Sequence, residues 1–333
     1  METKRVFTTI DTHTAGGPTR IITSGVPFLP GESLAEKFNY FKEHHDPIRK
    51  LLLTEPRGHK DMYGAVITEA TNPDADLGTF FMTASGYLPT CVHSAIGVAT
   101  AFLHTGALKL APPKNELVFE TPSGLVTLEP NYQDGRLISI GLQTQPAYVQ
   151  EIETKLPVGD KDFRVQLVFS GVFFVLINTS QNGLELKGDR LPDFTALGQQ
   201  VLAEANERFE TRHPELPNIK GFALALFYEQ TDRSHFKDIV IGRAGNIDRS
   251  PCGAGSGALA VLQSAKGELR SDEVIDIEGV IGTHFDAQIV RQVKVGAYPG
   301  GVPRISGSAC VTGFHQFVLD VEDPLKEGFV VGK

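Results

Sequence analysis

The chain has 333 residues, of which 41% are hydrophobic, and 40 Asp and Glu against 31 Lys and Arg give it a formal net charge of −9. This length and apolar content suffice for a large core and two domains. The negative charge argues against a nucleic-acid partner. No apolar segment approaches the roughly 20 residues that cross a bilayer, and the N-terminus lacks a signal-type apolar run. We therefore expect a cytoplasmic protein with no membrane partner. Its three cysteines are expected to be reduced thiols.

The first half of the chain is predicted to consist mainly of strands, with one helix that is interrupted by a proline. A Ser33 cap predicts a helix to about Leu53 with a break at Pro47. The polar segment 55–65 fits a catalytic loop and a solvated turn equally well. β-branched and apolar runs between turn residues predict strands over 6–11, 19–24, 66–68, 78–82, 116–120, 125–129 and 137–142.

The second half repeats this alternation. An amphipathic pattern predicts a helix over 194–209. Similar apolar runs predict strands over 163–169, 172–178, 222–228, 238–241, 274–278, 284–295, 309–311 and 316–319. Strands alternating with few helices predict an α+β fold.

Two cysteines each open a helix of small residues. Cys91 and Cys252 lie about half the chain apart, and the segments that follow them can be aligned as CVHSAIGVATAFLHTGAL and CGAGSGALAVLQSAKGEL. The alignment predicts an internal duplication. Two similar α+β halves would then each present a thiol at a helix N-terminus, and a pseudo-twofold axis would bring the thiols face to face across a cleft.

Paired thiols at helix N-termini suit proton transfer at carbon. The positive end of a helix favours thiolate over thiol. Inversion of a stereocentre next to a carboxylate needs one group to remove the proton and a second to deliver a proton to the opposite face. The first N–H groups of the same helices can bind the carboxylate as its charge grows.

Three further residues near or outside these helices are considered for a role. Asp248 could bind a substrate ammonium group or cap a turn. His93 could hydrogen-bond to Cys91 or to the substrate carboxylate, or be purely structural. Cys310 has no motif around it and is expected to be a buried core thiol.

Other classes of site fit less well. Gly253-x-Gly255-x-Gly257 has the wrong spacing for a dinucleotide site. Cys91, His93 and Cys252 could hold a metal ion, but the sequence offers no evident fourth ligand. We therefore expect no metal and no cofactor. A non-catalytic protein that binds small imino acids stays open as an alternative.

Several short segments are the most distinctive in the chain. They are Asp11-Thr12-His13-Thr14, Pro18-Thr19-Arg20, Glu55-Pro56-Arg57-Gly58-His59, Asp61-Met62, Cys91-x-His93, Asp248-Arg249-Ser250-Pro251-Cys252-Gly253, Thr312-Gly313 and Asp323-Pro324-Leu325. Through them, the sequence resembles the proline racemase family over nearly its whole length. This family includes proline racemases, 4-hydroxyproline 2-epimerases and trans-3-hydroxyproline dehydratases.

The resemblance implies a cofactor-independent enzyme with a diaminopimelate-epimerase-like fold. Two pseudo-symmetric lobes would enclose the active site in the cleft between them: residues 1–130 with about 312–333, carrying Cys91, and residues 131–311, carrying Cys252. Cys91 and Cys252 would be the acid/base pair, and Asp248 would meet the substrate amine. The carboxylate would be received by the backbone amides of Val92, His93, Gly253 and Ala254.

We expect a racemase or epimerase that inverts Cα of a proline-like imino acid. The first candidate is a 4-hydroxyproline 2-epimerase, and the second is a proline racemase. Cys252 favours inversion, since the dehydratase branch usually carries Thr there; dehydration or a divergent substrate are the alternatives. A homodimer is the expected assembly. The chain departs from the family pattern at several positions, which concern the pocket rather than the thiols: Gly17, Thr90, Val92, Val172 and Ala254.

Overall fold

The structure, a computed structural model, describes residues 5–110, 114–186, 190–271 and 273–331. The predicted α+β class is confirmed. The helices are α1 (Leu34–His44), α2 (Asp46–Leu53), α3 (Val92–Thr105), α4 (Leu191–Arg208), α5 (Gly253–Ala265) and the short 3₁₀ helix η1 (Ser180–Asn182). Among the described residues, no helix has the length and apolar character needed to span a bilayer.

The chain divides into two compact units. Unit 1 comprises the residues up to Leu142 together with those from Ser308 onward, and unit 2 runs from Gln143 to Gly307. The lobe bounds near residues 130 and 311 stay predictions.

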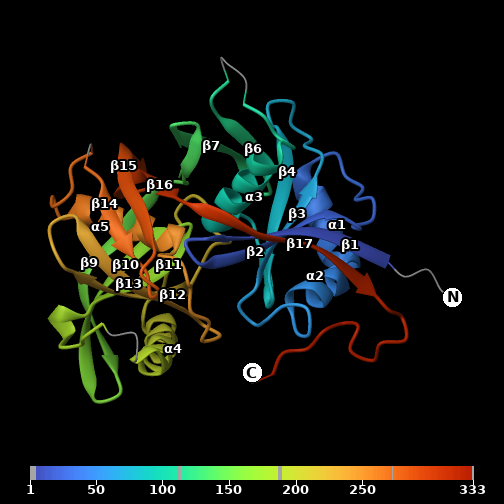
Figure 1. Cartoon of the computed structure of the whole chain (residues 1–333). Helices are drawn as coiled ribbons and strands as arrows, with labels where there is room; N and C mark the ends of the chain where they lie inside the picture. Colours follow the sequence, from blue (N-terminus) through green and yellow to red (C-terminus); the bar gives the residue numbers. More distant parts are fainter. Residues whose placement is uncertain (1–4, 111–113, 187–189, 272, 332–333) are drawn as a thin grey trace. The chain divides into compact units, whose positions relative to one another are not determined.

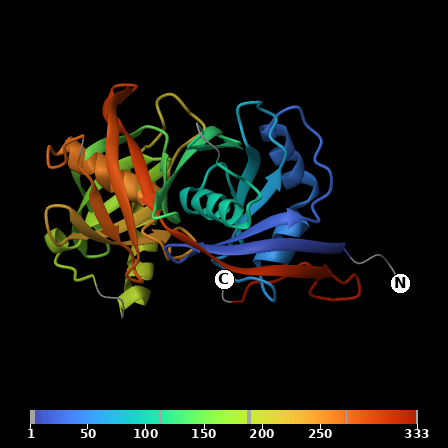
Figure 2. The same ribbon diagram turned by 45° about the horizontal axis from the view of Figure 1, so that its top comes forward.

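Unit 1 is built on a mixed sheet. Its strands are β1 (Arg5–Thr14), β2 (Gly17–Ser24), β3 (Tyr63–Thr68), β4 (Leu77–Thr83), β5 (Gly86–Leu88), β6 (Leu117–Thr121), β7 (Gly124–Gln133), β8 (Arg136–Gln143) and β17 (Ala309–Leu319). The hairpin β1–β2 is followed by a parallel β2–β3 pair, an antiparallel β3–β4 pair and a parallel β4–β6 pair, and then by the meander β6–β7–β8. β17 pairs with β1, and the two strands run side by side in Figure 2.

Unit 2 contains the remaining strands. They are β9 (Ala147–Val158), β10 (Lys161–Ser170), β11 (Val172–Asn178), β12 (Phe222–Gln230), β13 (His235–Gly242), β14 (Ile275–Glu278), β15 (His284–Val295) and β16 (Tyr298–Gly307). Because β9 pairs with both β10 and β16, these strands close into a barrel.

The same order of strand pairings occurs in both units. In unit 2, the hairpin β10–β11 is followed by a parallel β11–β12 pair, an antiparallel β12–β13 pair, a parallel β13–β14 pair and an antiparallel β14–β15–β16 meander. This is the sequence of pairings from β1 to β8 in unit 1. The cysteine-led helices α3 and α5 occupy equivalent places in the two series, which confirms the predicted internal repeat.

Small residues allow α3 and α5 to lie deep inside their units. Nearly every residue of α5 from Gly253 to Gln263 is buried, and the helix packs against β9, β10, β15 and β16 (Figure 1). A Cβ at Gly257 would lie 2.7 Å from Ser170 Oγ and 3.2 Å from Pro303 Cγ. A larger residue at this position would require Ser170 and Pro303 to move, so glycine allows the close contact between helix and strands.

Most elements follow the sequence prediction. The helix break is confirmed: Ser33 caps α1, and Pro47 lies in the first turn of α2. The strands predicted over 6–11 and 19–24 are longer in the structure, because β1 and β2 continue to a tight turn at Ala15 and Gly16, both with positive φ.

Two strands of unit 2 were missed, and two predicted strands proved to be one. β9 carries a run of exposed charged residues, and β16 contains Pro299 and Pro303, which weaken a strand signal. The predicted strands over 309–311 and 316–319 form the continuous β17, which runs through Gly313.

Candidate active site

Cys91 lies at the N-terminus of α3. It is the N-cap residue with extended backbone, φ −154° and ψ 114°, and its carbonyl oxygen accepts a hydrogen bond from Ala95 N at 3.0 Å. Cys91 is 9% exposed. The first N–H groups of a helix have no acceptor within it, so the amides of Val92 and His93 are suited to binding an anion beside the thiol.

The ring of His93 lies against Cys91. Cys91 Sγ is 3.6 Å from His93 Nδ1 and 4.0 Å from Nε2. Thr14 Oγ1 donates a hydrogen bond to the His93 carbonyl oxygen at 2.7 Å, and the ring of Tyr63 meets the imidazole edge-on, with 4.4 Å between ring centroids. His93 is therefore held in place from β1 and β3, with its ring beside the sulfur.

Polar neighbours lower the pKa of Cys91. Burial by itself would raise the pKa of the thiol, but the charge and hydrogen bond of His93 and hydrogen bonds from Ser94 outweigh it, so the pKa lies below its ordinary value. Cys91 is thus the better candidate for a resting thiolate.

Two of the unusual residues lie close to His93. A Cβ at Gly17 would be 3.3 Å from His93 Cδ2, so a side chain at position 17 would crowd the imidazole ring, and glycine avoids this contact. The half-buried side chain of Val92 packs against the apolar core of unit 1. The branched side chain at this position therefore contributes to packing, and the backbone N–H of Val92 is unaffected by it.

Cys252 lies at the N-terminus of α5 in a strained conformation. Its φ of 50° and ψ of 104° differ from those of Cys91, and it is one of three described non-glycine residues with positive φ. Such a backbone costs about 1–3 kcal/mol and is found preferentially at functional sites. Cys252 is 7% exposed.

Asp248 caps the turn that leads to Cys252. Its Oδ1 accepts hydrogen bonds from Ser250 N at 3.0 Å and Ser250 Oγ at 2.9 Å. Ser250 Oγ in turn accepts from Cys252 N at 3.3 Å. The turn-capping role of Asp248 is therefore confirmed, and its role towards a substrate ammonium group stays a prediction.

Asp238, on β13, is a residue near this site that the sequence analysis missed. Its side chain is 1% exposed, and Oδ2 has no hydrogen-bond partner among the described residues. Burial, and then the charge of Asp248, raise the pKa of Asp238 well above its usual value. An aspartate directly before the apolar residues 239–241 of a predicted strand was the available signal, because charged residues are rarely buried without a partner.

The pKa of Cys252 is raised, in contrast to that of Cys91. Burial and then the charge of Asp248 raise the pKa of this thiol well above its ordinary value, and Asp238 adds to the shift against a backbone hydrogen bond from Gly255. Cys252 is thus the better candidate for a resting thiol. Because Cys91 belongs to unit 1 and Cys252 to unit 2, their pairing stays a prediction.

The distinctive N-terminal segments form a buried ion pair. Asp11 and Arg20 are directly opposite each other on β1 and β2, and Arg20 Nη2 lies 2.7 Å from Asp11 Oδ2. Arg20 Nη1 donates to the carbonyl oxygens of Leu52 and Arg57 at 2.6 and 2.5 Å. These residues therefore join the first hairpin to the end of α2 and to the segment that follows it.

The polar segment 55–65 anchors the C-terminal segment of the described chain. Arg57 Nη2 lies 3.0 Å from Asp323 Oδ2, and Glu55 and Phe329 exchange backbone hydrogen bonds at 3.0 and 2.9 Å. These contacts support the structural reading of this segment.

The expected burial of Cys310 was wrong. Cys310 is exposed, because the residues of β17 alternate between two environments and Cys310 falls on the exposed side next to the half-buried Ala309.

Comparisons with known proteins agree with the fold. The sequence model of a family described as proline racemase matches residues 9–330. The chain is 39% identical to a proline racemase of Clostridioides difficile, over 99% of this chain and 100% of that protein. It is 36% identical to a 4-hydroxyproline 2-epimerase of Streptosporangium roseum, again over 99% and 100%. A crystal structure of a hydroxyproline epimerase from Agrobacterium vitis with bound trans-4-hydroxy-L-proline matches with a TM-score of 0.88 and 27% identity, over 99% of this chain and 96% of that one.

Proposed function

This chain belongs to the proline racemase family, and on that premise we propose that it inverts Cα of a proline-like imino acid without a cofactor, using Cys91 and Cys252 as its acid and base. The observation that carries the proposal is that both cysteines begin buried, small-residue helices at equivalent places of a repeated topology. One thiol for each face of the substrate is what inversion by two bases requires.

The two thiols have complementary resting states in this proposal. The lowered pKa of Cys91 suits a thiolate that removes the Cα proton, and the raised pKa of Cys252 suits a thiol that delivers a proton to the opposite face. After one inversion Cys91 carries the proton and Cys252 is the thiolate. The reverse reaction, or proton exchange with water, restores the starting state.

The substrate carboxylate would be bound by the first amides of the two helices. The N–H groups of Val92 and His93 on α3, and of Gly253 and Ala254 on α5, can take up the charge that develops as Cα loses its proton. Asp248 would receive the substrate amine through its carboxylate. Ser250 already fixes the orientation of that carboxylate by two hydrogen bonds.

The relatives point to two substrates. The 39%-identical relative is named for proline, and the epimerase structure holds trans-4-hydroxy-L-proline. We retain trans-4-hydroxy-L-proline as the first candidate substrate and L-proline as the second. Cytoplasmic location and a homodimer belong to the same proposal, and sedimentation of the purified chain tests the latter.

The test is a substrate screen in heavy water followed by polarimetry and mass analysis. L-Proline, trans-4-hydroxy-L-proline and trans-3-hydroxy-L-proline are compared with the unsubstituted chain, Cys91→Ser and Cys252→Ser. We expect inversion with one deuterium at Cα, and loss of turnover by at least about a thousandfold in each variant, comparable to the loss of a catalytic residue. Activity retained in either variant contradicts the two-base mechanism. Loss of water from the 3-hydroxy substrate identifies a dehydratase instead, and binding without Cα exchange identifies a non-catalytic protein.

A further inference from the structure

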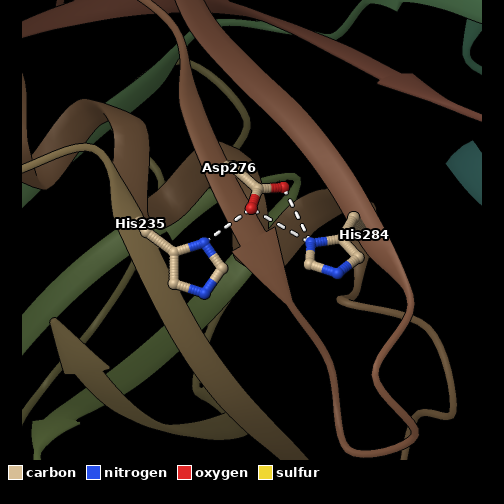
Figure 3. A group of neighbouring side chains, drawn as sticks. All are labelled: His235, Asp276 and His284. Carbon is tan, nitrogen blue, oxygen red and sulfur yellow. Dashed lines mark hydrogen bonds and ion pairs between the residues drawn. The ribbon is translucent and has the colours of Figure 1, made fainter. Parts of the chain in front are cut away.

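Two histidines and an aspartate meet on the outer side of the barrel of unit 2, outside the residues assigned to catalysis. His235 begins β13, Asp276 lies on β14 and His284 begins β15 (Figure 3). His235 is directly opposite Asp276 in the parallel pair, and the alternate residues Phe236, Ile277 and Phe285 are buried. The strand alternation therefore places all three polar side chains on the same partly exposed face.

The ring nitrogens converge on one carboxylate. His235 Nδ1 is 2.6 Å from Asp276 Oδ2, and His284 Nδ1 is 3.0 Å from both carboxylate oxygens. One potential ligand atom from each residue lies within 4.8 Å of the others. Bond lengths of 2.0–2.2 Å to zinc place neighbouring ligand atoms about 3.3 Å apart, so the three atoms need to move relative to one another by no more than about 1.5 Å to surround an ion.

His235 also has the outer partner that metal-binding histidines usually have. Its Nε2 lies 3.3 Å from Glu278 Oε2, and Lys237 Nζ is 3.1 Å from the same oxygen. A metal-bound imidazole commonly donates its second N–H to a carboxylate, which fixes the tautomer and the ring orientation. Here, a proton on Nε2 directed at Glu278 leaves the lone pair of Nδ1 directed towards Asp276.

The charges around the cluster also favour a cation. Asp276 and Asp286 are directly opposite each other on β14 and β15, and such like-charged pairs are destabilising. A neutral imidazole carries one ring proton, so His235 cannot donate to Asp276 and Glu278 at once. A positive charge at this point, carried by protons or by a metal ion, would stabilise these carboxylates in addition to the charge of Lys237.

We propose that His235, Asp276 and His284 bind a divalent transition-metal ion of the zinc type, which joins β13, β14 and β15. Two imidazole nitrogens and a carboxylate oxygen form a donor set that zinc accepts, with water as the remaining ligand. The ion has a structural role here, and this site is independent of the proposed catalytic thiols.

The test has two readouts. Crystals of the full-length chain are soaked in zinc and the ion is located from anomalous scattering at the zinc edge. In parallel, zinc is titrated against a chromophoric chelator, using a chain in which Cys91, Cys252 and Cys310 are replaced by Ser, so that thiolates cannot bind the ion. The variants His235→Gln and His284→Gln are compared with His104→Gln, which removes an exposed histidine on α3.

We expect one ion per chain with density among the three side chains. Each of His235→Gln and His284→Gln should weaken binding by at least about tenfold, the effect of losing even an outer partner, whereas His104→Gln should leave it unchanged. Zinc should also raise Tm of the unsubstituted chain and not that of His284→Gln. The proposal would be overturned by equal zinc affinity in all variants, by zinc density only at the cysteines, or by no zinc uptake. The positive charge at the cluster would then come from protonated histidines.

Discussion

The two helix-capping cysteines differ in charge environment. Cys91 has the ring of His93 and the hydroxyl and backbone N–H of Ser94 near its sulfur, whereas Cys252 lies near two carboxylates, Asp248 and Asp238. The positive end of a helix is common to both, so the neighbouring side chains decide which thiol loses its proton first.

Alkylation should separate the two thiols by pH. Because the pKa of Cys91 is lowered, its thiolate forms as the pH rises through values below about 8.5, the ordinary pKa of a thiol. Because the pKa of Cys252 is raised, this thiol stays protonated above that pH. We expect iodoacetamide, followed by peptide mass analysis, to label Cys91 at lower pH than Cys252, with the exposed Cys310 as an internal reference. Earlier labelling of Cys252 would contradict the assignment.

Removal of the Asp238 charge should shift Cys252 in a known direction. Asp238→Asn deletes a carboxylate that raises the pKa of Cys252, so the onset of Cys252 alkylation should move to lower pH. Burial and Asp248 still act, and the pKa should stay above that of Cys91.

The control for this variant is Glu207→Gln, an exposed change on α4. An unchanged alkylation profile in Asp238→Asn, equal to that of the control, would show that this carboxyl does not influence the thiol.

At the scale of elements, an ion pair determines how the first hairpin joins the helices. The carboxylate of Asp11 accepts from Arg20 and also from Thr9 Oγ1 at 3.0 Å, and the Arg20 guanidinium lies over the ring of Phe317, 4.2 Å from its centroid. Both charged residues are 7% exposed. Loss of one partner would leave the other charged and buried.

Asp11→Ala should therefore lower the free energy of unfolding by about 3–5 kcal/mol, as for other buried pairs from which one member is removed. The double variant Asp11→Ala/Arg20→Met should recover part of that loss, because it removes both charges. Urea unfolding of the full chain measures both. A loss below about 1 kcal/mol in Asp11→Ala would show that the pair is not important for stability.

Local sequence signals predicted the helices and most strands. Ser33, Pro47 and the two cysteine-led runs carry their information within a few residues, and the structure has helices at each. β16 could not be predicted in this way, because its prolines and glycines oppose a strand locally and its pairing with β15 and β9 depends on distant residues.

The candidate site was predictable to a similar extent. Helix-opening cysteines can be recognised in sequence, but the effect of Asp238 on Cys252 depends on β13 packing near α5, and the exposure of Cys310 depends on which side of β17 it occupies.

At the scale of the whole molecule, one series of strand pairings occurs twice, each time around a helix that begins with a cysteine. Closure of β9 on β10 and β16 completes the barrel of unit 2. A duplicated unit supplies two nearly equivalent helix N-termini, and this is the arrangement that inversion at a carbon atom uses, with one base for each face.

The most direct test of the two-thiol account follows deuterium at Cα in both substrate and product at early times in heavy water. Trans-4-hydroxy-L-proline and L-proline are each converted to a small percentage. Substrate and product are then separated, and their deuterium content is measured by mass spectrometry. Two bases on opposite faces predict product with deuterium at Cα and recovered substrate that still carries hydrogen. Deuterium appearing equally fast in the recovered substrate would indicate a single base and would contradict the pairing of Cys91 with Cys252.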